Sequence, residues 1–179
     1  EDCAMGMPGP DGQFVGGPIL GTGHFTPLEQ TGLDPQTGQG KQPGAFWMFA
    51  AQGAEVEIDE ATGQVTILNL TAAHDVGKAI NMDGCTGQIE GALGQGIGQS
   101  MFEEMIVEDG IVTNPSLMDY KIPCTLDLPN MVPMVVEEPH PEGPWGAKGV
   151  GEPGLAPTAP CIASAIYDAL GIQIRVIPF

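Results

Sequence analysis

Residues 85–106 read CTGQIEGALGQGIGQSMFEEMI, and the spacing of apolar residues in this stretch decides the fold class. Apolar side chains recur every four residues along it, at Ile89, Leu93, Ile97, Met101 and Met105. Polar residues such as Glu90, Gln99 and Glu103 fall between them. This period predicts an amphipathic helix over residues 85–106, with one face turned towards a core.

The same stretch carries five glycines, at Gly87, Gly91, Gly94, Gly96 and Gly98. Each glycine costs a helix about 1 kcal/mol relative to alanine, so we expect something to approach the helix backbone closely. Packing against another part of the protein and contact with a cofactor both remain open. A nucleotide loop is disfavoured, because the spacing is neither GxGxxG nor GxxxxGK[ST]. Gln88 favours a cofactor with a heterocyclic edge, because its amide, at the expected helix start, both donates and accepts hydrogen bonds.

The segments on either side of this helix have strand and helix patterns. Residues 46–59 alternate apolar with acidic side chains, EATG forms a turn, and QVTILNLTAAHDVG follows, which predicts a β-hairpin. Residues 129–139 have strand composition, but their prolines indicate an edge strand. Residues 159–171 predict a helix that stops at Gly171, and residues 172–179 predict a closing strand. The fold class is therefore α+β, with short antiparallel strands and packed helices.

Residues 1–44 have turn motifs and only a short apolar piece, at residues 14–20. Long irregular segments in compact proteins are usually functional or packed on a partner. We therefore divide the chain into a loop-rich segment, residues 1–44, that packs on a partner chain, and a domain formed by residues 45–179. Glycine and proline make up about a quarter of the chain, but 42% hydrophobic residues argue for an ordered protein.

The net charge is −18, from 23 acidic residues against five lysines and arginines. Such a charge opposes binding to nucleic acid and to anionic membranes, and the sequence has no apolar run long enough to span a bilayer. The four cysteines and three histidines are scattered, without CxxC or HExxH spacing. These patterns predict a cytoplasmic protein with reduced thiols, and no metal held by protein side chains.

A second glycine-rich stretch, GPWGAKGVGEPGLAP at Gly143–Pro157, surrounds a single acid, Glu152. A lone carboxylate is usually a solvated surface group. In this stretch the flanking residues offer little solvation, while Trp145, Val150 and Leu155 could form an apolar wall. Desolvation raises the pKa of a carboxyl group towards that of a general base, so a functional role and a solvated surface role both stay open.

A third motif, HDVGKAIN, places His74 and Asp75 after a predicted strand. The two residues could form an acid/base pair. A turn-stabilising aspartate beside a partly buried histidine is the commoner arrangement at such a position. A serine hydrolase lacks support, because the sequence contains no GxSxG motif.

Taken together, four motifs resemble one family. AAHDVGKAIN, GQIEGALGQGIGQSMFEE, MDYKIP and GAKGVGEPGLAPTAPCIASAIYDALG follow the order and approximate spacing of the molybdenum-binding subunit of the xanthine dehydrogenase and aldehyde oxidase family. The resemblance covers roughly residues 44–179. Each motif alone is weak, whereas the set of four is specific.

The resemblance implies a molybdopterin cofactor, in bacteria usually its cytosine dinucleotide form, whose dithiolene sulfurs hold the molybdenum. Glu152 matches the active-site glutamate of the family, which acts as a base beside the metal. Gln88 matches the glutamine that hydrogen-bonds the pterin. Gly149, Val150 and Gly151 match the loop whose backbone flanks the cofactor, and Gly91 would allow the cofactor to approach the helix.

The resemblance also implies a hydroxylase that oxidises an aldehyde or an N-heterocycle with water as the oxygen source. Family members carry several hundred further residues upstream, so this chain resembles the C-terminal part of the second molybdopterin-binding domain, as a fragment or as a split-gene product. It would act only with a chain carrying the remaining molybdenum-binding domains, an iron–sulfur subunit with 2Fe–2S clusters and a flavin subunit with FAD.

Two alternatives to this function are considered. The first is a non-catalytic structural subunit with the same fold, which would be expected to have degraded site motifs. The second is a carboxylate-based hydrolase, which would need a second acid facing Glu152.

Some relatives are exported as folded complexes, so the resemblance leaves export of the assembly open.

Overall fold

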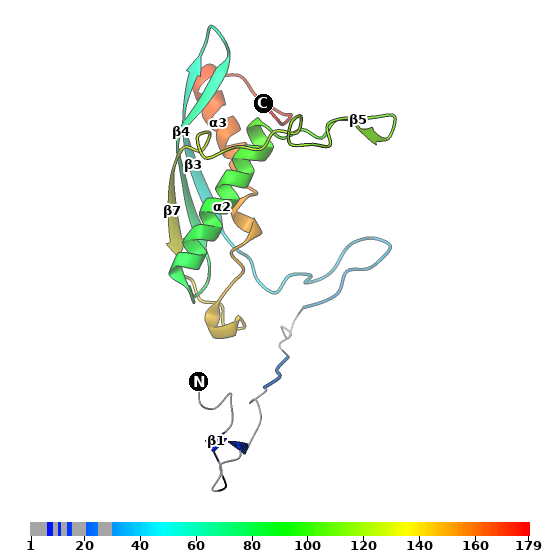
Figure 1. Cartoon of the computed structure of the whole chain (residues 1–179), viewed down its shortest axis with the longest axis vertical. Coiled ribbons are helices and arrows are strands. Elements are labelled where there is room, and N and C mark those ends of the chain that lie inside the picture. Colours follow the sequence, from blue (N-terminus) through cyan, green and yellow to red (C-terminus); the bar gives the residue numbers. More distant parts are fainter. Residues whose placement is uncertain (1–6, 9–10, 12–13, 16–20, 25–29) are drawn as a thin grey trace. The chain divides into compact units, whose positions relative to one another are not determined.

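The computed structural model describes residues 7–8, 11, 14–15, 21–24 and 30–179 (Figure 1). The chain divides into two compact units, Glu1–Ala45 and Phe46–Phe179. In the first unit, β1 (Met7–Pro8) pairs antiparallel with β2 (Phe14–Val15). The described residues between β2 and Ala45 contain only turns and irregular backbone. Most of the predicted apolar piece, residues 16–20, lies outside the described residues.

The second unit is built on a β-hairpin, as the sequence predicted. Strand β3 (Ala50–Asp59) pairs antiparallel with β4 (Gln64–Asp75) around a turn in which Gly63 has φ 77°. The register shifts at Glu55/Val56, because Leu68 is an extra residue in β4. Beyond this bulge Leu70, Ala72 and His74 share the buried face of β4.

The third strand, β7 (Asn130–Val136), corrects the expectation of an all-antiparallel sheet. It lies at the sheet edge in the order β3-β4-β7, as predicted from its prolines, but it pairs parallel with β4. A parallel pair needs a long crossover, and the chain between β4 and β7 includes helix α2. An edge position tolerates Pro133, which has no N–H to donate to a further strand.

Helix α2 runs from Met82 to Met101, earlier at both ends than the predicted 85–106. It begins where the Asn81 side chain accepts a hydrogen bond from the Gly84 N–H at 2.9 Å. It ends before Glu103, whose carboxylate accepts a hydrogen bond from the Tyr120 hydroxyl at 2.6 Å. Ile89, Leu93 and Ile97 are buried as predicted, whereas Met105 lies beyond the helix and is 64% exposed.

Helix α3 (Thr158–Leu170) ends at Gly171, which has φ 70°, as predicted. Helices α2 and α3 pack on one face of the sheet and against each other (Figure 1). The core between these layers consists of Leu70, Ala72, Ile89, Leu93, Ile97, Ile162 and Ile166. The predicted closing strand is wrong, because residues 172–179 find no strand partner among the described residues. Instead the Phe179 N–H donates to the Ser100 carbonyl at 2.8 Å.

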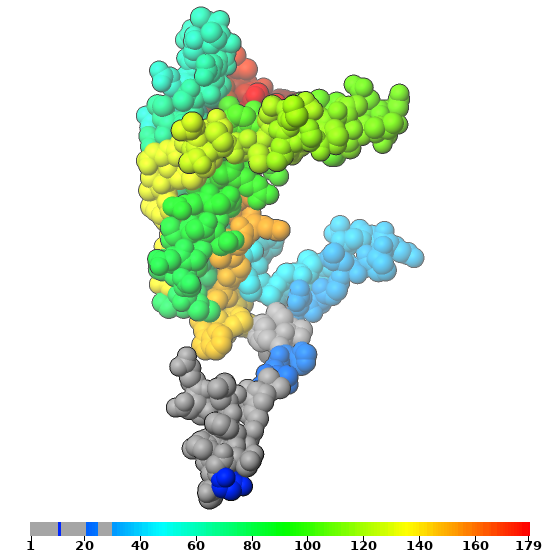
Figure 2. All heavy atoms as spheres, viewed as in Figure 1, coloured from blue at the N-terminus to red at the C-terminus, as the bar shows by residue number. Residues whose placement is uncertain are grey.

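Between α2 and β7 the chain forms an arm that projects from the body of this unit (Figure 2). The arm carries the short hairpin of β5 (Val107–Glu108) and β6 (Ile111–Val112). Between β7 and α3 lie two single-turn 3₁₀ helices, η1 (Pro144–Gly146) and η2 (Glu152–Gly154). Residues 147–155, around η2, form the loop that carries the motif residues.

Candidate functional site

The fold brings residues 149–152, called the GVGE loop below, and the first half of α2 together. A Cβ placed on Gly151 would lie 3.7 Å from Gln88 Oε1, so these two residues are neighbours. Gln88 lies within α2 rather than at its first turn, and its side chain is exposed. Gly149 approaches a third segment, because a Cβ there would lie 3.4 Å from Met48 Sδ. The sequence-predicted residues Gln88, Gly149 and Gly151 therefore belong to one surface.

A hollow of about 330 Å³ opens beside this surface. Its walls come from the end of β4, the start of α2 and the glycine-rich loop, including Val76, Lys78, Gln88, Lys148 and Val150. Val76 and Val150 give it an apolar side. The Gln88 amide supplies both a donor and an acceptor at its edge. The arrangement suits a flat, polar-edged heterocycle with an apolar face.

Glu152 is the first residue of η2 and is exposed to solvent. The predicted apolar wall around it is not formed by the described residues. Trp145 is 86% exposed, and Val150 turns to pack against the core instead. Trp145 also has φ 52°, a left-handed backbone conformation that costs energy for a side chain with a Cβ. Trp145 and Val150 therefore leave Glu152 exposed, whereas Leu155, the third residue of the predicted wall, is half-buried.

Four of the glycines of α2 divide into two sets. A Cβ on Gly87 or Gly91 would meet nothing within 4 Å, so this part of the helix presents bare backbone outward. A Cβ on Gly96 would lie 2.5 Å from Thr158 Cβ, and one on Gly98 would overlap the Glu103 carboxylate. The packing explanation therefore applies to only some of these glycines, and the cofactor explanation stays a prediction for the others. Internal packing accounts for Gly96 and Gly98, and leaves Gly87 and Gly91 unexplained within the described residues.

The HDVG motif contains no His–Asp hydrogen bond. Asp75 Oδ2 accepts from Lys148 Nζ at 2.6 Å, and Asp75 Oδ1 accepts from the Gly77 N–H at 2.9 Å. Burial works to raise the pKa of Asp75, but the hydrogen bonds from Lys148 and Gly77 outweigh it and hold that pKa below its usual 3.8. Asp75 is therefore an ionised structural carboxylate, which agrees with the turn-stabilising alternative.

His74 is fully buried, and neither ring nitrogen has a hydrogen-bond partner among the described residues. Burial lowers the pKa of His74 below its usual 6.5, and the neighbouring Asp75 carboxylate opposes that shift only in part. Its ring lies under η2, because a Cβ on Gly154 would be 3.9 Å from His74 Nδ1. His74 is thus a neutral core residue beneath η2, which begins at the last residue of the GVGE loop.

Lys148 is a residue of this site that was not predicted from the sequence. The residue lies between two glycine-rich pieces of the motif, and its Nζ makes a buried ion pair with a carboxylate 73 positions away. The signal available was composition, since it is one of only five lysines and arginines in the chain. Because cations are rare in this acidic chain, a lysine beside the motif that carries Glu152 is expected to pair with a specific carboxylate.

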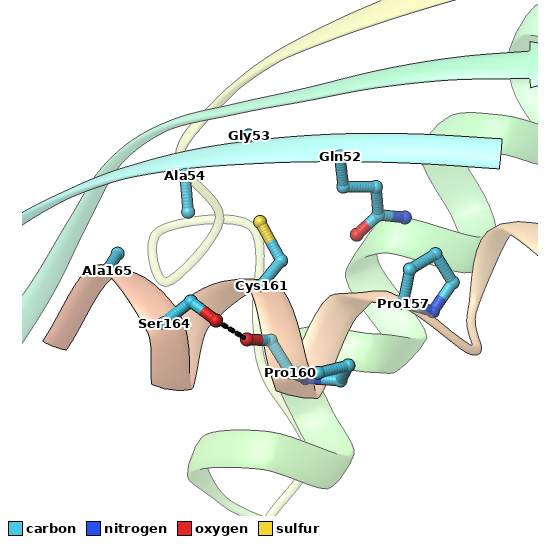
Figure 3. A pocket seen from close by; sticks show the side chains of 8 residues that line it. All are labelled: Gln52, Gly53, Ala54, Pro157, Pro160, Cys161, Ser164 and Ala165. Carbon is cyan, nitrogen blue, oxygen red and sulfur yellow. Dashed lines mark hydrogen bonds between the residues drawn. The ribbon is translucent and has the colours of Figure 1, made fainter. Parts of the chain in front are cut away.

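A second hollow, of about 470 Å³, lies between β3 and α3 (Figure 3). Gln52 and Ala54 face Cys161 and Ser164 across it, and the Ser164 hydroxyl donates to the Pro160 carbonyl at 2.8 Å. Burial raises the pKa of the Cys161 thiol, which makes it a weaker nucleophile at neutral pH. This hollow has no charged lining residue, and the Gln52 amide on its wall already donates from Nε2 to the Gly154 carbonyl at 2.6 Å.

Two absences hold for the part of the chain that the structure describes. That part contains no cluster of three or more His, Cys, Asp or Glu side chains able to hold a metal ion. No helix in it is long and apolar enough to cross a membrane.

Comparison with known proteins gives consistent matches. Residues 10–129 match the family model of a molybdopterin cofactor-binding domain. A xanthine dehydrogenase molybdenum-binding subunit of Escherichia coli O157:H7 is 38% identical over 132 residues, which are 73% of this chain and 18% of that protein. An aldehyde oxidoreductase of Megalodesulfovibrio gigas is 37% identical over 158 residues, or 88% of this chain and 17% of that protein.

Solved structures agree with the sequence matches. The crystal structure of quinoline 2-oxidoreductase from Pseudomonas putida 86 aligns with a TM-score of 0.65 and 36% identity, over 70% of this chain and 16% of that one. The chain thus spans less than a fifth of the length of the relatives it matches. The family match begins at residue 10, well before Gly44, where the sequence resemblance began.

Proposed function

The chain belongs to the molybdopterin-binding family of the xanthine dehydrogenases and aldehyde oxidoreductases, and we propose that it supplies the catalytic base of a molybdenum hydroxylase. The proposed assembly oxidises an aldehyde or an N-heterocycle and takes the oxygen atom from water. The observation that carries the proposal is the juxtaposition of Gln88 with the loop that presents Glu152. Both lie on a surface that this chain leaves open.

The residues of that surface fit a molybdopterin. The bare backbone of Gly87 and Gly91 offers space that a Cβ would fill. The Gln88 amide can pair with a pterin edge, which carries both donors and acceptors. Gly149, Val150 and Gly151 can bring backbone close to the cofactor, since two of the three lack a Cβ. We propose these residues and Gly91 as cofactor contacts, with the metal held by the dithiolene of the pterin.

When bound, the cofactor would supply two-electron redox chemistry, in which an aldehyde and water give a carboxylic acid, two protons and two electrons. The protein's task in that reaction is to hold groups and to move a proton. The Glu152 carboxylate accepts the proton of the attacking oxygen, because it is an exposed acceptor at the tip of the loop. The Gln88 amide orients the pterin, and Val76 and Val150 give the hollow an apolar side on which a flat ring can pack.

The proposed function requires other chains. Glu152, Gly91 and Trp145 face outward from this chain, so walls of the pocket must come from elsewhere. We propose a partner that carries the remaining molybdenum-binding domains and that also contacts residues 1–44. An iron–sulfur subunit with 2Fe–2S clusters and a flavin subunit with FAD take the electrons onward. We also propose the cytosine dinucleotide form of the pterin. A cytoplasmic location is proposed because the chain is acidic and its thiols are expected to be reduced.

Substitution Glu152→Gln in the natively purified assembly tests the base directly. The amide keeps the size of the carboxylate but cannot take the proton, so we expect turnover to fall by about 10²–10⁴-fold. Molybdenum content and assembly should stay at wild-type levels. Glu138→Gln, at another exposed glutamate, is the matched control. Wild-type turnover in Glu152→Gln would contradict the role of Glu152, and oxygen from O₂ rather than labelled water would contradict the hydroxylase chemistry.

A further inference from the structure

The ion pair between Asp75 and Lys148 is buried in the protein. The two side chains are 7% and 6% exposed, and Asp75 Oδ2 lies 2.6 Å from Lys148 Nζ. A second ion pair, Lys78–Glu137, is 52% and 35% exposed. Exposed pairs stabilise proteins little, whereas a buried pair is retained only with good geometry and further hydrogen bonds. Asp75 has such a bond, because it also accepts from the Gly77 N–H.

Backbone contacts place Lys148 firmly on the end of β4. The Lys148 N–H donates to the Val76 carbonyl at 2.9 Å, and the Lys78 N–H donates to the Gly146 carbonyl at 2.8 Å. Gly77 and Ala147 form an antiparallel bridge between these hydrogen bonds. A Cβ on Gly77 would lie 2.7 Å from the Lys148 nitrogen, so only glycine allows this approach. Lys148 is therefore fixed through both its main chain and its side chain.

A second anchor holds the other end of the loop. The Gly154 carbonyl accepts from Gln52 Nε2 at 2.6 Å and from the Thr158 hydroxyl at 3.3 Å. A Cβ on Gly154 would lie 2.9 Å from Ala92 Cβ, so the turn packs directly on α2. Glu152 thus lies between two fixed points, four residues after Lys148 and two before Gly154.

Of the residues between Lys148 and Glu152, Val150 packs against the core, whereas the two glycines contribute no such contact. Gly149 and Gly151 have no side chain, and glycine populates a wide range of backbone conformations. A Cβ on Gly149 would touch only Met48, and one on Gly151 only Gln88. The direction of the Glu152 side chain therefore depends on the anchors together with the packing of Val150.

We propose that Asp75 and Lys148 are a positioning pair that sets the place of Glu152 relative to Gln88. This inference rests on the proposed role of Glu152 as the base. The pair does not contact the reacting atoms. It acts by fixing the start of the loop, so that the carboxylate stays where an incoming proton can reach it.

The test uses the natively purified assembly with four variants: Asp75→Asn, Lys148→Met, the double variant, and Glu137→Gln as a control at the exposed pair. For each variant we measure the molybdenum content, the melting temperature and the hydrogen exchange of the peptide around residues 149–152. Benzaldehyde and quinoline are the substrates for kcat, expressed per molybdenum, and for KM. Glu152→Gln is measured alongside.

We expect both single variants to melt lower, because each leaves one charge buried without its partner. A displacement of about 1 Å can cost about 10²-fold in rate, so kcat per molybdenum should fall by that order while KM changes little. The double variant should recover the melting temperature, because no unpaired charge remains. It should not recover kcat, and the loop amides should still exchange faster than in the wild type. Glu137→Gln should keep wild-type kcat.

Recovery of kcat together with melting temperature in the double variant would overturn the proposal and make the pair a matter of stability alone. Loss of molybdenum from all three pair variants would also overturn it and assign the pair to cofactor retention. If Glu152→Gln is inactive while the pair variants keep kcat, only the positioning role fails. If Glu152→Gln turns over normally, the proposed function of Glu152 fails as well.

Discussion

The two halves of helix α2 use glycine for opposite reasons. In the second half, Gly96 and Gly98 lie against Thr158 and Glu103, and each lacks room for a Cβ. In the first half, Gly87 and Gly91 have nothing within 4 Å of that position. The helix bears the cost of glycine at all four positions. Packing inside the chain justifies that cost only in the second half.

This difference separates what the chain does for its own fold from what it offers to other molecules. The second half of α2 completes the core with α3. The first half lies beside the GVGE loop and, together with Gln88, forms an open surface. If the proposed function is right, substitutions at Gly96 and Gly98 should damage folding, and substitutions at Gly87 and Gly91 should damage cofactor retention and leave folding intact.

The largest effect is expected for Gly96→Ala. The added methyl would overlap the fully buried Thr158, so the chain must shift α3 or lose the helix contact. Overpacking of this kind costs about 1–3 kcal/mol and sometimes more, so the melting temperature and soluble yield of the assembly should fall clearly. Thr158→Gly in the same chain should restore part of the loss. An unchanged melting temperature in Gly96→Ala would contradict the packing explanation.

Gly91→Ala is the matched variant in the first half. It should preserve stability or raise it by up to about 1 kcal/mol, since alanine is the better helix former and meets no neighbour in this chain. The methyl would instead intrude on the proposed cofactor, and we expect molybdenum retention to weaken by about tenfold, the scale of a modest overpacking penalty. Molybdenum analysis after gel filtration measures this. Full retention would remove Gly91 from the proposed contacts.

The smallest effect concerns His74, beneath the loop that the first half of α2 faces. Its folded pKa lies below the unfolded 6.5, so between these two values the unfolded chain binds more protons. Stability should therefore fall as the pH drops through this window, by at most about 1.4 kcal/mol per pH unit. His74→Leu should lose this dependence between pH 7.5 and 5.5. Equal pH dependence of melting in both proteins would contradict a neutral buried His74.

Asp75 does not interfere with that test. Its pKa is held below 3.8, so its contribution to stability is complete above that value and is lost only as the pH falls further. The titrations of the two neighbouring residues therefore separate, and the window above pH 5 reports on His74.

The parts of the fold that follow from local patterns were predictable. The hairpin of β3 and β4 follows from alternation around a turn, and α3 follows from its period and Gly171. The edge position of β7 follows from Pro133. Each of these depends on residues close together in the sequence.

The parts that depend on distant contacts were not predictable. The parallel pairing of β7 with β4 is set by the crossover through α2, and residues 172–179 have strand composition but no partner strand. The contact between Lys148 and Asp75 joins two motifs that the sequence presents separately. The surroundings of Glu152 were misjudged because Val150 belongs to the core and Trp145 to the surface.

The central claim is that the open surface around Gln88 and Glu152 completes a molybdenum site with a partner chain. The most direct test is molybdenum and iron analysis of the assembly purified natively through this chain, with the co-purifying chains identified by mass. The account predicts one molybdenum per copy, together with iron and a larger chain that carries the remaining molybdenum-binding domains. An intact assembly without molybdenum would contradict it and would favour a non-catalytic structural subunit with the same fold.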